Sequence, residues 1–448
     1  MTIENKGAMT ATLVIAASDS LNKSAANLVC TGVNDHLAIQ EALDALPATG
    51  GEVFLLDGTY NCEVQIDLDS YQTLRGCGRN TILTTSTADL VFLSAVGGAG
   101  TEKVHIVIAD LQIDGGVGRV SNCGIYFEYV DYSLIQNVYS RRHNGSDYYS
   151  GVYLDNSDFN QIVNNICQEN NRGICPTNSN NNTISGNTCQ GNDGVGIYFF
   201  INGNNTIIGN TCQENSYGIY LVDSNSNTII GNTCLENSQA ADNTYDNIFL
   251  GGSDYNLIAN NVCRQGALGN KPRYGINISD VASDKNIIQG NDLHDAGKTA
   301  NFNDAGTLTI VQDDNREIDV IQYKHYIHVK NTSGSQRVAG DVVIIKGIAT
   351  AVEFTTTVTQ GDDKVYGMVA ETIEDDASGY VLVKGFTAVL KVNGTIDIAI
   401  DDILGAFTTA CIAMKAAAGD QGFALALEAY ATDDSNGVID AYIISPWD

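Results

Sequence analysis

Basic residues, proline and long apolar runs are all scarce in this chain of 448 residues. Only 23 Lys and Arg stand against 53 Asp and Glu, which gives a formal net charge of −30. Nucleic-acid binding needs a clustered basic face, because phosphate neutralisation supplies most of the affinity. Arg141-Arg142 is the only pair of adjacent basic residues. We therefore expect no nucleic-acid partner, and the charge repels polyanionic glycans unless a local patch or a metal intervenes.

Membrane and export signals are also missing from the pattern. No stretch approaches the roughly 18 consecutive apolar residues of a membrane-spanning helix. The apolar run at 11–17 lacks the basic start and the cleavage site of a signal peptide, and it is more typical of a strand. The sequence predicts a protein made in the cytoplasm without a signal peptide and without a membrane partner.

What the chain does contain is a repeat. The motif Asn-x-Cys recurs through residues 165–263, and it is offset from a second motif that reads "GIYFFI" at 196 and "GIYLVD" at 218. A period of 20–30 residues with strand content is typical of a solenoid. Two or three short strands per repeat predict the rungs of a parallel β-helix, in which equivalent residues stack about 4.8 Å apart.

The repeat predicts side-chain columns along this β-helix. Its cysteine column has the members Cys167, Cys189, Cys212, Cys234 and Cys263, with Tyr139 and Leu293 aligned at its two ends, and its asparagine column has the members Asn187, Asn210 and Asn232. Paired ligands such as Cys-x-x-Cys are absent from the sequence, and stacked strands do not offer disulfide geometry. We interpret the cysteines as small buried hydrophobes and predict neither a metal nor a cofactor.

Ahead of the repeat, residues 35–46 have the pattern of an amphipathic helix. Leu37, Ile39 and Leu43 fall on one face, Asn34 or Asp35 is suited to cap the helix, and a proline follows it. Such a helix covers the first rung of a solenoid. The arrangement over residues 10–300 resembles the pectin-lyase-like superfamily in its phage and microbial form. That resemblance implies a right-handed β-helix but leaves the function open between lyases, hydrolases, tailspikes and structural rods.

The repeat ends near residue 300, and residues 325–448 show alternating strands with Gly and Asp turns. They predict a small antiparallel β barrel or sandwich. The segment "NTSGSQRVAGDVVIIKG" near its start resembles phage capsid decoration (cement) proteins, which implies assembly on a virion surface, commonly as trimers. The predicted fold class is all-β. Its parts are an N-terminal strand and capping helix (1–50), the parallel β-helix (51–300), a linker (301–324) and the small β domain (325–448).

Candidate catalytic groups are few. Glu214 and Glu236 occupy one position of adjacent repeats, so they could lie at the short carboxylate separation of a retaining glycosidase. The alternative is an exposed acidic edge at a turn. Arg141, Arg142 and His143 form the one cluster that could supply the base of a lyase.

Tyrosines are frequent in the early repeats. Four of them are candidates for stacking on sugar rings: Tyr126, Tyr148, Tyr149 and Tyr153. Packing in the core is the alternative, because strand alternation places about half of such residues inside.

Three functions follow from these observations. The first is a virion structural protein, such as a capsid decoration protein, head fibre or spike, that forms homotrimers and binds a virion or surface assembly protein. The second is a tailspike-like depolymerase, a hydrolase or lyase that cleaves a host surface polysaccharide. The third is a non-catalytic glycan-binding adhesin or surface filament. The absence of a catalytic motif favours a protein that is not an enzyme.

Overall fold

The structure, a computed structural model, describes residues 12–116, 118, 121–144, 149–312 and 315 and, beyond residue 323, nine strands and a few residues near them. The chain divides into two compact units. The first comprises residues 1–284 and 290–306, and the second comprises residues 285–289 and 307–448. Strands β33 and β34, at Ala300–Asp304 and Ile310–Val311, lie in the range where the sequence indicated a linker.

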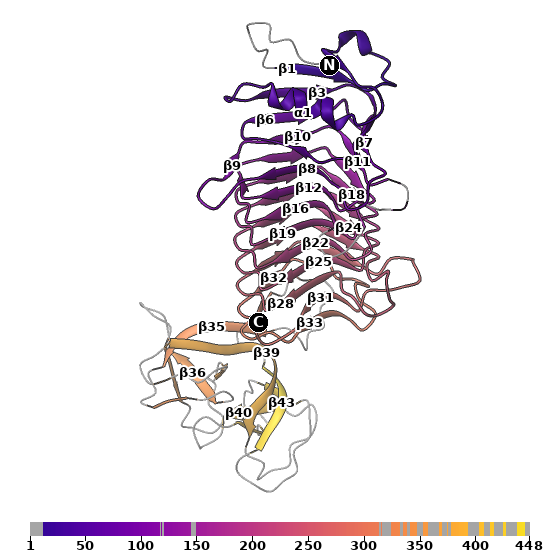
Figure 1. Ribbon diagram of the computed structural model, residues 1–448. Helices are drawn as coiled ribbons and strands as arrows, with labels where there is room; N and C mark the ends of the chain where they lie inside the picture. Colours follow the sequence, from indigo (N-terminus) through magenta and orange to yellow (C-terminus); the bar gives the residue numbers. More distant parts are fainter. Residues whose placement is uncertain are drawn as a thin grey trace. The chain divides into compact units, whose positions relative to one another are not determined.

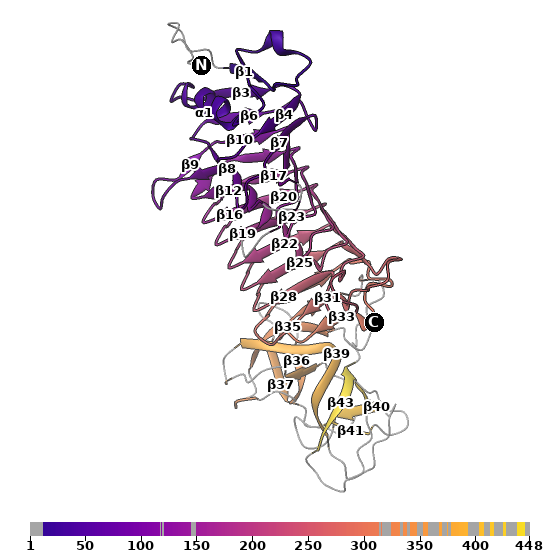
Figure 2. The same ribbon diagram turned by 45° about the vertical axis from the view of Figure 1, so that its right-hand side comes forward.

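Three parallel sheets run the length of the first unit (Figures 1 and 2). Sheet A has the order β2 (Leu28–Val29), β1 (Thr12–Ala16), β3 (Gly51–Leu55), β6 (Gln72–Arg75), β10 (Val107–Ala109), β14 (Leu134–Gln136), β17 (Gln161–Val163), β20 (Thr183–Ser185), β23 (Thr206–Ile208), β26 (Thr228–Ile230) and β29 (Leu257–Ala259). Sheet B has the order β4 (Gly58–Asn61), β7 (Thr81–Thr84), β11 (Gln112–Asp114), β15 (Tyr139–Arg141), β18 (Ile166–Gln168), β21 (Thr188–Gln190), β24 (Thr211–Gln213), β27 (Thr233–Leu235) and β30 (Val262–Arg264).

Sheet C has the order β5 (Ile66–Asp67), β8 (Val91–Val96), β12 (Cys123–Glu128), β16 (Ser150–Asp155), β19 (Arg172–Thr177), β22 (Val195–Phe200), β25 (Tyr217–Val222), β28 (Ile248–Gly251), β31 (Tyr274–Ile278) and β33. The chain visits the three sheets in turn and returns one rung further along. A short parallel pair, β9 (Lys103–Val104) and β13 (Val130–Asp131), lies beside them. This is the predicted right-handed parallel β-helix.

The rungs turn corners by using left-handed backbone conformations. At the end of the sheet-B strands the corner residues Glu169, Gly191, Glu214 and Glu236 have φ between 53° and 59°. Only small or flexible residues adopt this region cheaply. The corners explain why Asn, Asp, Ser and Gly separate the short strands of the repeat.

The capping helix α1 spans His36–Asp44 and buries Ile39 and Leu43. Two details of the sequence interpretation are wrong. The Asp35 side chain does not cap the helix but accepts hydrogen bonds from the backbone N–H of Gly32 and Asn61, each at 2.9 Å. Leu37 is 63% exposed, because it lies at the start of the helix away from the first rungs. A single 3₁₀ turn, η1 (Lys23–Ala25), precedes the helix.

The second unit contains the parallel pair β32 (Ile287–Gln289) and β34 and one nine-stranded sheet. The strands of that sheet are β35 (Lys324–Asn331), β36 (Val342–Lys346), β37 (Glu353–Thr356), β38 (Gly367–Val369), β39 (Ser378–Val392), β40 (Ile403–Ala406), β41 (Ala413–Lys415), β42 (Ala424–Ala426) and β43 (Gly437–Ile443). Most neighbours are antiparallel, as the sequence predicted, but β35–β37 and β39–β41 are parallel.

These nine strands close into two five-stranded rings that share the long strand β39. The first ring runs β35-β37-β36-β38-β39 and closes through β35–β39, and the second runs β39-β41-β40-β42-β43 and closes through β39–β43. Each pairing of the first ring has a counterpart of the same direction in the second. The sequences "EDDASG" at 374 and "TDDSNG" at 432 also correspond. The two rings therefore repeat one pattern of strand pairing, which the sequence analysis did not predict.

Candidate functional site

The outer face of sheet C is the candidate functional site. Along its strands the residues alternate between the interior and the outer surface, so that Ile125 and Phe127 are fully buried while Tyr126 and Glu128 point outward. Because equivalent residues of successive rungs are in register, each outward position becomes a column along the β-helix axis.

The central outward column is mainly aromatic. In order along the β-helix its members are Ser94, Tyr126, Tyr153, Cys175, Tyr198, Tyr220, Phe249, Asn277 and Asn303. Ring centroids are 5.6 Å apart for Tyr126 and Tyr153. They are 5.5 Å apart for Tyr198 and Tyr220, and 4.5 Å apart for Tyr220 and Phe249. We call this set the aromatic column.

A groove of about 790 Å³ follows the aromatic column across β8, β12, β16, β19 and β22. Its walls combine aromatic rings with polar groups, notably Tyr126, Tyr153, Tyr198, Phe200, Arg172 and Asp155. A concave site with an apolar lining and a few convergent polar groups is the usual form of a ligand site.

Charged groups flank the aromatic rings in this groove. Arg172 places its guanidinium carbon 4.6 Å from the ring centroid of Tyr198. On the other side Glu128 and Asp155 are direct neighbours in register on β12 and β16, and the Tyr126 hydroxyl donates to Glu128 at 3.0 Å. Desolvation, and then the nearby Glu128, raise the pKa of Asp155. Burial and the bond to Glu128 raise the pKa of Tyr126.

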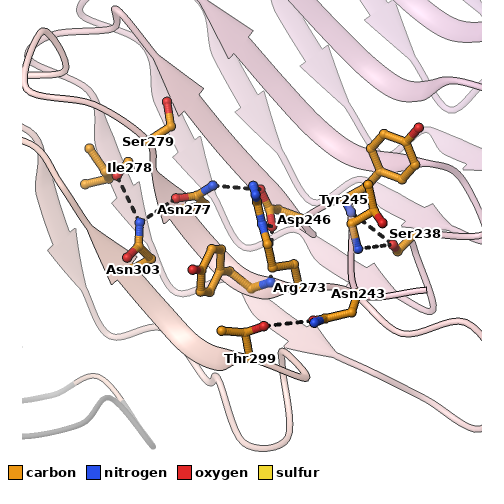
Figure 3. Close-up of polar contacts among 12 residues, drawn as sticks. Ser238, Asn243, Tyr245, Asp246, Arg273, Asn277, Ile278, Ser279, Thr299 and Asn303 are labelled. Carbon is orange, nitrogen blue, oxygen red and sulfur yellow. Dashed lines mark hydrogen bonds and ion pairs between the residues drawn. The ribbon is translucent and has the colours of Figure 1, made fainter. Parts of the chain in front are cut away.

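The aromatic column continues into a polar cluster that Figure 3 shows. Asp246 is fully buried and accepts hydrogen bonds from Arg273 Nη2 (2.8 Å), Asn277 Nδ2 (2.8 Å) and the Tyr274 backbone N–H (3.1 Å). Asn303 in turn donates to Asn277 at 2.8 Å. Burial raises the pKa of Asp246 although these donors oppose the shift. Because the Asp246 carboxylate already accepts these hydrogen bonds, we interpret the cluster as a structural one that holds the last rungs together.

The interior of the β-helix contains the columns indicated by the repeat. The five Asn-x-Cys cysteines lie in register on β18, β21, β24, β27 and β30, fully buried and without disulfides. Asn187 donates through Nδ2 to Asn210 Oδ1, and Asn210 donates likewise to Asn232, each at 3.0 Å.

Glycine explains why the cysteine column tolerates only small residues. The second motif places Gly173 and Gly196 opposite the cysteines, and a Cβ added at Gly173 would lie 2.8 Å from Cys189 Sγ. At the start of the column the sequence alignment is wrong by one residue. Ser140, not Tyr139, pairs in register with Cys167, and Tyr139 points outward. A slip of one residue exchanges the two faces of a strand.

Glu214 and Glu236 lie one rung apart at the corner after sheet B. Glu236 Oε1 accepts backbone N–H groups of Ala267 (2.5 Å) and Leu268 (3.2 Å). Glu214 accepts from Gln190 Nε2 at 3.3 Å. Both carboxylates lie away from the groove lining, and Glu236 holds a loop in place.

The cluster Arg141–Arg142–His143 does not form a solvent-facing site. His143 is fully buried, and its Nδ1 lies 2.6 Å from Ser121 Oγ. Desolvation lowers the pKa of His143 to about 3. Arg142 forms an ion pair with Asp114 at 2.5 Å. The His143 backbone N–H donates to Asn170 Oδ1, and the Asn170 backbone N–H donates to Asn192 Oδ1, so His143 lies at the start of a second interior asparagine column.

Of the four candidate tyrosines, Tyr126 and Tyr153 line the groove, but Tyr153 is only 4% exposed. Tyr149 is only 6% exposed and donates its hydroxyl to Asp89 at 2.5 Å, while Tyr148 lies outside the described residues. The sequence analysis missed Arg172, Asp155 and Tyr198. Tyr198 holds the outward position of the second motif, whereas Arg172 begins β19 and Asp155 ends β16, so only the strand register brings the three together.

The described residues contain no group of three or more His, Cys, Asp or Glu arranged to hold a metal ion. None of their helices is both long and apolar enough to cross a membrane.

The fold defines the class of this chain as a right-handed parallel β-helix protein. A family model described as periplasmic copper-binding protein (NosD) matches residues 84–262, which is less than half of the chain. A search of curated proteins finds no match.

Solved structures share the fold at low sequence identity. DFA-IIIase from Arthrobacter chlorophenolicus A6, a mutant in complex with DFA-III, is 14% identical over 68% of this chain and 85% of its own, with a TM-score of 0.50. ORF18 of Geobacillus virus E2 is 14% identical over 78% of this chain and 73% of its own, with a TM-score of 0.49. The Dettilon tailspike protein is 12% identical over 91% and 90%, with a TM-score of 0.47. These likenesses show the fold alone.

Proposed function

We propose that this protein binds a polysaccharide along the outer face of sheet C. The observation that carries the proposal is the groove of about 790 Å³ that follows the aromatic column. Aromatic side chains offer an apolar face with a polar end, and the carboxylates and guanidinium beside them offer hydrogen-bond partners for hydroxyl groups. Rungs about 4.8 Å apart repeat these features along the axis, which suits a linear polymer of sugar rings.

The test is a polysaccharide panel incubated with the full-length protein and its double variant Tyr126→Ser/Tyr198→Ser, which changes the two partly exposed tyrosines of the groove. We expect one or more polysaccharides to bind the protein, and the double variant to bind at least about tenfold more weakly, because it loses two stacking surfaces. Tyr255→Ser is the matched control, since Tyr255 is a 58% exposed tyrosine at a corner away from the groove. Equal loss in both variants, or no binding to any polysaccharide, would contradict the proposal.

The same panel separates binding from cleavage. New reducing ends would identify a hydrolase, and ultraviolet absorbance from unsaturated products would identify a lyase. Either product would make the protein a tailspike-like depolymerase. Binding without product is what we expect of an adhesive spike.

A structural role on a virion surface is the second candidate, and the second unit favours it. Its two closed rings pair every strand of the sheet with two neighbours, so the sheet itself has no open edge strand. We propose that this unit joins the chain into homotrimers and onto a virion or surface assembly protein. Light scattering of the full chain and of a chain without residues 325–448 tests this. A trimer that survives the deletion would contradict it.

A further inference from the structure

A second line of aromatic rings lies outside the groove, at the corner that leads into sheet A. Its members are Tyr71, His105, Tyr132 and Phe159. The register of β6, β10, β14 and β17 aligns the residue two positions after each of them, so the four occupy one position of four successive rungs. None of the four lines the groove. We call this set the corner strip.

The rings of the corner strip are open to solvent. Tyr71 is 48% exposed, Tyr132 54% and Phe159 44%, and His105 is exposed as well. Successive ring centroids are 5.4, 6.0 and 4.9 Å apart. The last pair, Tyr132 and Phe159, is parallel within 5°, and a contact of about 3.5–4.0 Å between the planes leaves the rings displaced sideways by about 3 Å. Part of each ring face therefore stays uncovered.

The backbone gains nothing from aromatic residues at this corner. All four residues of the strip have φ between 52° and 67°, a left-handed conformation that is unfavourable for bulky side chains. On the next two rungs the same position is held by Asn181 and Asn204, which adopt this conformation more readily. Burial does not compensate for the cost, because the rings are exposed. Strain that is kept at an exposed position indicates a function.

The charges beside the corner strip indicate what it binds. Asp131 and Asp158 directly precede Tyr132 and Phe159 in the chain, and Asp131 Oδ1 accepts the Asp158 backbone N–H at 2.7 Å. Carboxylates on adjacent rungs accept hydrogen bonds from hydroxyl groups. They repel an anionic polymer, and they repel a second copy of this chain, whose net charge is −30. Apolar ring faces beside hydrogen-bond acceptors fit an uncharged polymer that is rich in hydroxyl groups.

We propose that the corner strip is a second binding site, for an uncharged polysaccharide whose sugar rings lie on the exposed aromatic faces and whose hydroxyl groups donate to Asp131 and Asp158. The strip runs along the β-helix axis with the spacing of the rungs, which suits a linear polymer. The proposal goes beyond the groove on sheet C, because the two sites share no aromatic residue.

The experiment uses a substitution that the chain itself makes on later rungs. Tyr132→Asn/Phe159→Asn removes two rings of the corner strip and installs the residue found at this position on the next two rungs. Tyr255→Asn is the matched control, since Tyr255 is a 58% exposed tyrosine at the same corner position whose neighbour on the preceding rung is Ser226. Circular dichroism should show unfolding temperatures for both variants no lower than that of the unaltered protein.

Calorimetric titration of the full-length proteins with dextran, mannan, galactan, polygalacturonate and alginate gives the affinities. We expect the unaltered protein and Tyr255→Asn to bind a neutral polysaccharide within about twofold of each other, and Tyr132→Asn/Phe159→Asn to bind it at least about tenfold more weakly. The groove variant Tyr126→Ser/Tyr198→Ser should keep a weak binding that disappears when the two strip substitutions are added.

The other outcomes separate this proposal from the proposed function. Unchanged binding by the strip variant, with binding lost in the groove variant, would overturn the second site and leave the groove standing. Tighter binding of polygalacturonate or alginate than of every neutral polymer would overturn the uncharged class. A smaller particle by light scattering for the strip variant, with unchanged binding, would assign the corner strip to a contact between copies of the chain. No binding of any of the five polymers would overturn both proposals.

Discussion

The interior asparagine column and the outer aromatic column arise from the same rung repeat, yet they differ in continuity. Inside, Asn187, Asn210 and Asn232 follow one another without a break, and each amide bonds to the next. Outside, the aromatic column is broken at Cys175. The asparagines lie at the corners between the sheet-A and sheet-B strands, whereas the aromatic column lies on the strands of sheet C.

Solvent explains the difference. A buried amide that loses its partner has no water to replace it, and the unpaired group costs about 1–3 kcal/mol. An outer ring that loses its neighbour exposes a ring face to water or to a ligand. The interior column is therefore constrained by folding at every rung, whereas the omission of a ring from the outer column leaves no buried amide unpaired.

The largest effect is expected from breaking the interior column. Asn210→Leu would leave unpaired the backbone N–H of Asn187 and the carbonyl of Ile184, which bond to Asn210 at 2.9 Å each. We expect a loss of about 4 kcal/mol in the free energy of unfolding, measured in urea. Gln213→Ala, on the outer face of β24 in the same rung, is the control. An equal loss in the free energy of unfolding for the two variants would show that the interior column is no more constrained by folding than the outer surface.

A second interior effect depends on pH. Folded His143 has a pKa of about 3, against 6.5 for the ordinary side chain. Between these values the unfolded chain binds a proton that the folded chain excludes. The free energy of unfolding should therefore fall as the pH drops from 6.5 towards 3, by about 1.4 kcal/mol per unit from this group.

His143→Asn is the variant that isolates this contribution. His143 begins a second interior column, in which Asn170 holds the equivalent position of the next rung. Asparagine therefore fits this position, and its side chain does not titrate. Urea unfolding of both proteins at pH 7 and at pH 4.5 should show a smaller loss on acidification for the variant. The same loss in both would mean that His143 is protonated within the fold.

A smaller effect on stability is expected on the outside. Tyr220→Cys would open a second gap, between Tyr198 and Phe249, and remove two ring contacts of the aromatic column. We expect a loss of about 1–2 kcal/mol in the free energy of unfolding, below that of Asn210→Leu. A loss as large as the interior one would show that the aromatic column also supports the fold.

The sequence was sufficient to predict the β-helix, because its period, its corner residues and its capping helix are local features. It was not sufficient to show which residues of each rung point into the β-helix and which point outward. Tyr139 and Ser140 exchange roles through a register slip of one residue, and His143 appeared beside two arginines without any sign that it lies inside.

The site was harder to predict for the same reason. Glu128 and Asp155 are 27 positions apart along the chain, and neither belongs to a motif. Only the register of β12 with β16 makes them neighbours. Cys175 is not part of the Asn-x-Cys repeat, and only the register of β16, β19 and β22 shows that it lies between Tyr153 and Tyr198 in the outward column.

The smallest effect is expected at the corner acids. Glu236→Gln keeps an oxygen that can accept the N–H groups of Ala267 and Leu268, so it should cost within about 0.5 kcal/mol. Glu214→Gln should cost as little. Neither should change polysaccharide binding or any release of products, since both residues lie away from the groove lining. A loss of product release in either variant, with the fold intact by circular dichroism, would move the active site from the outer face of sheet C to this corner.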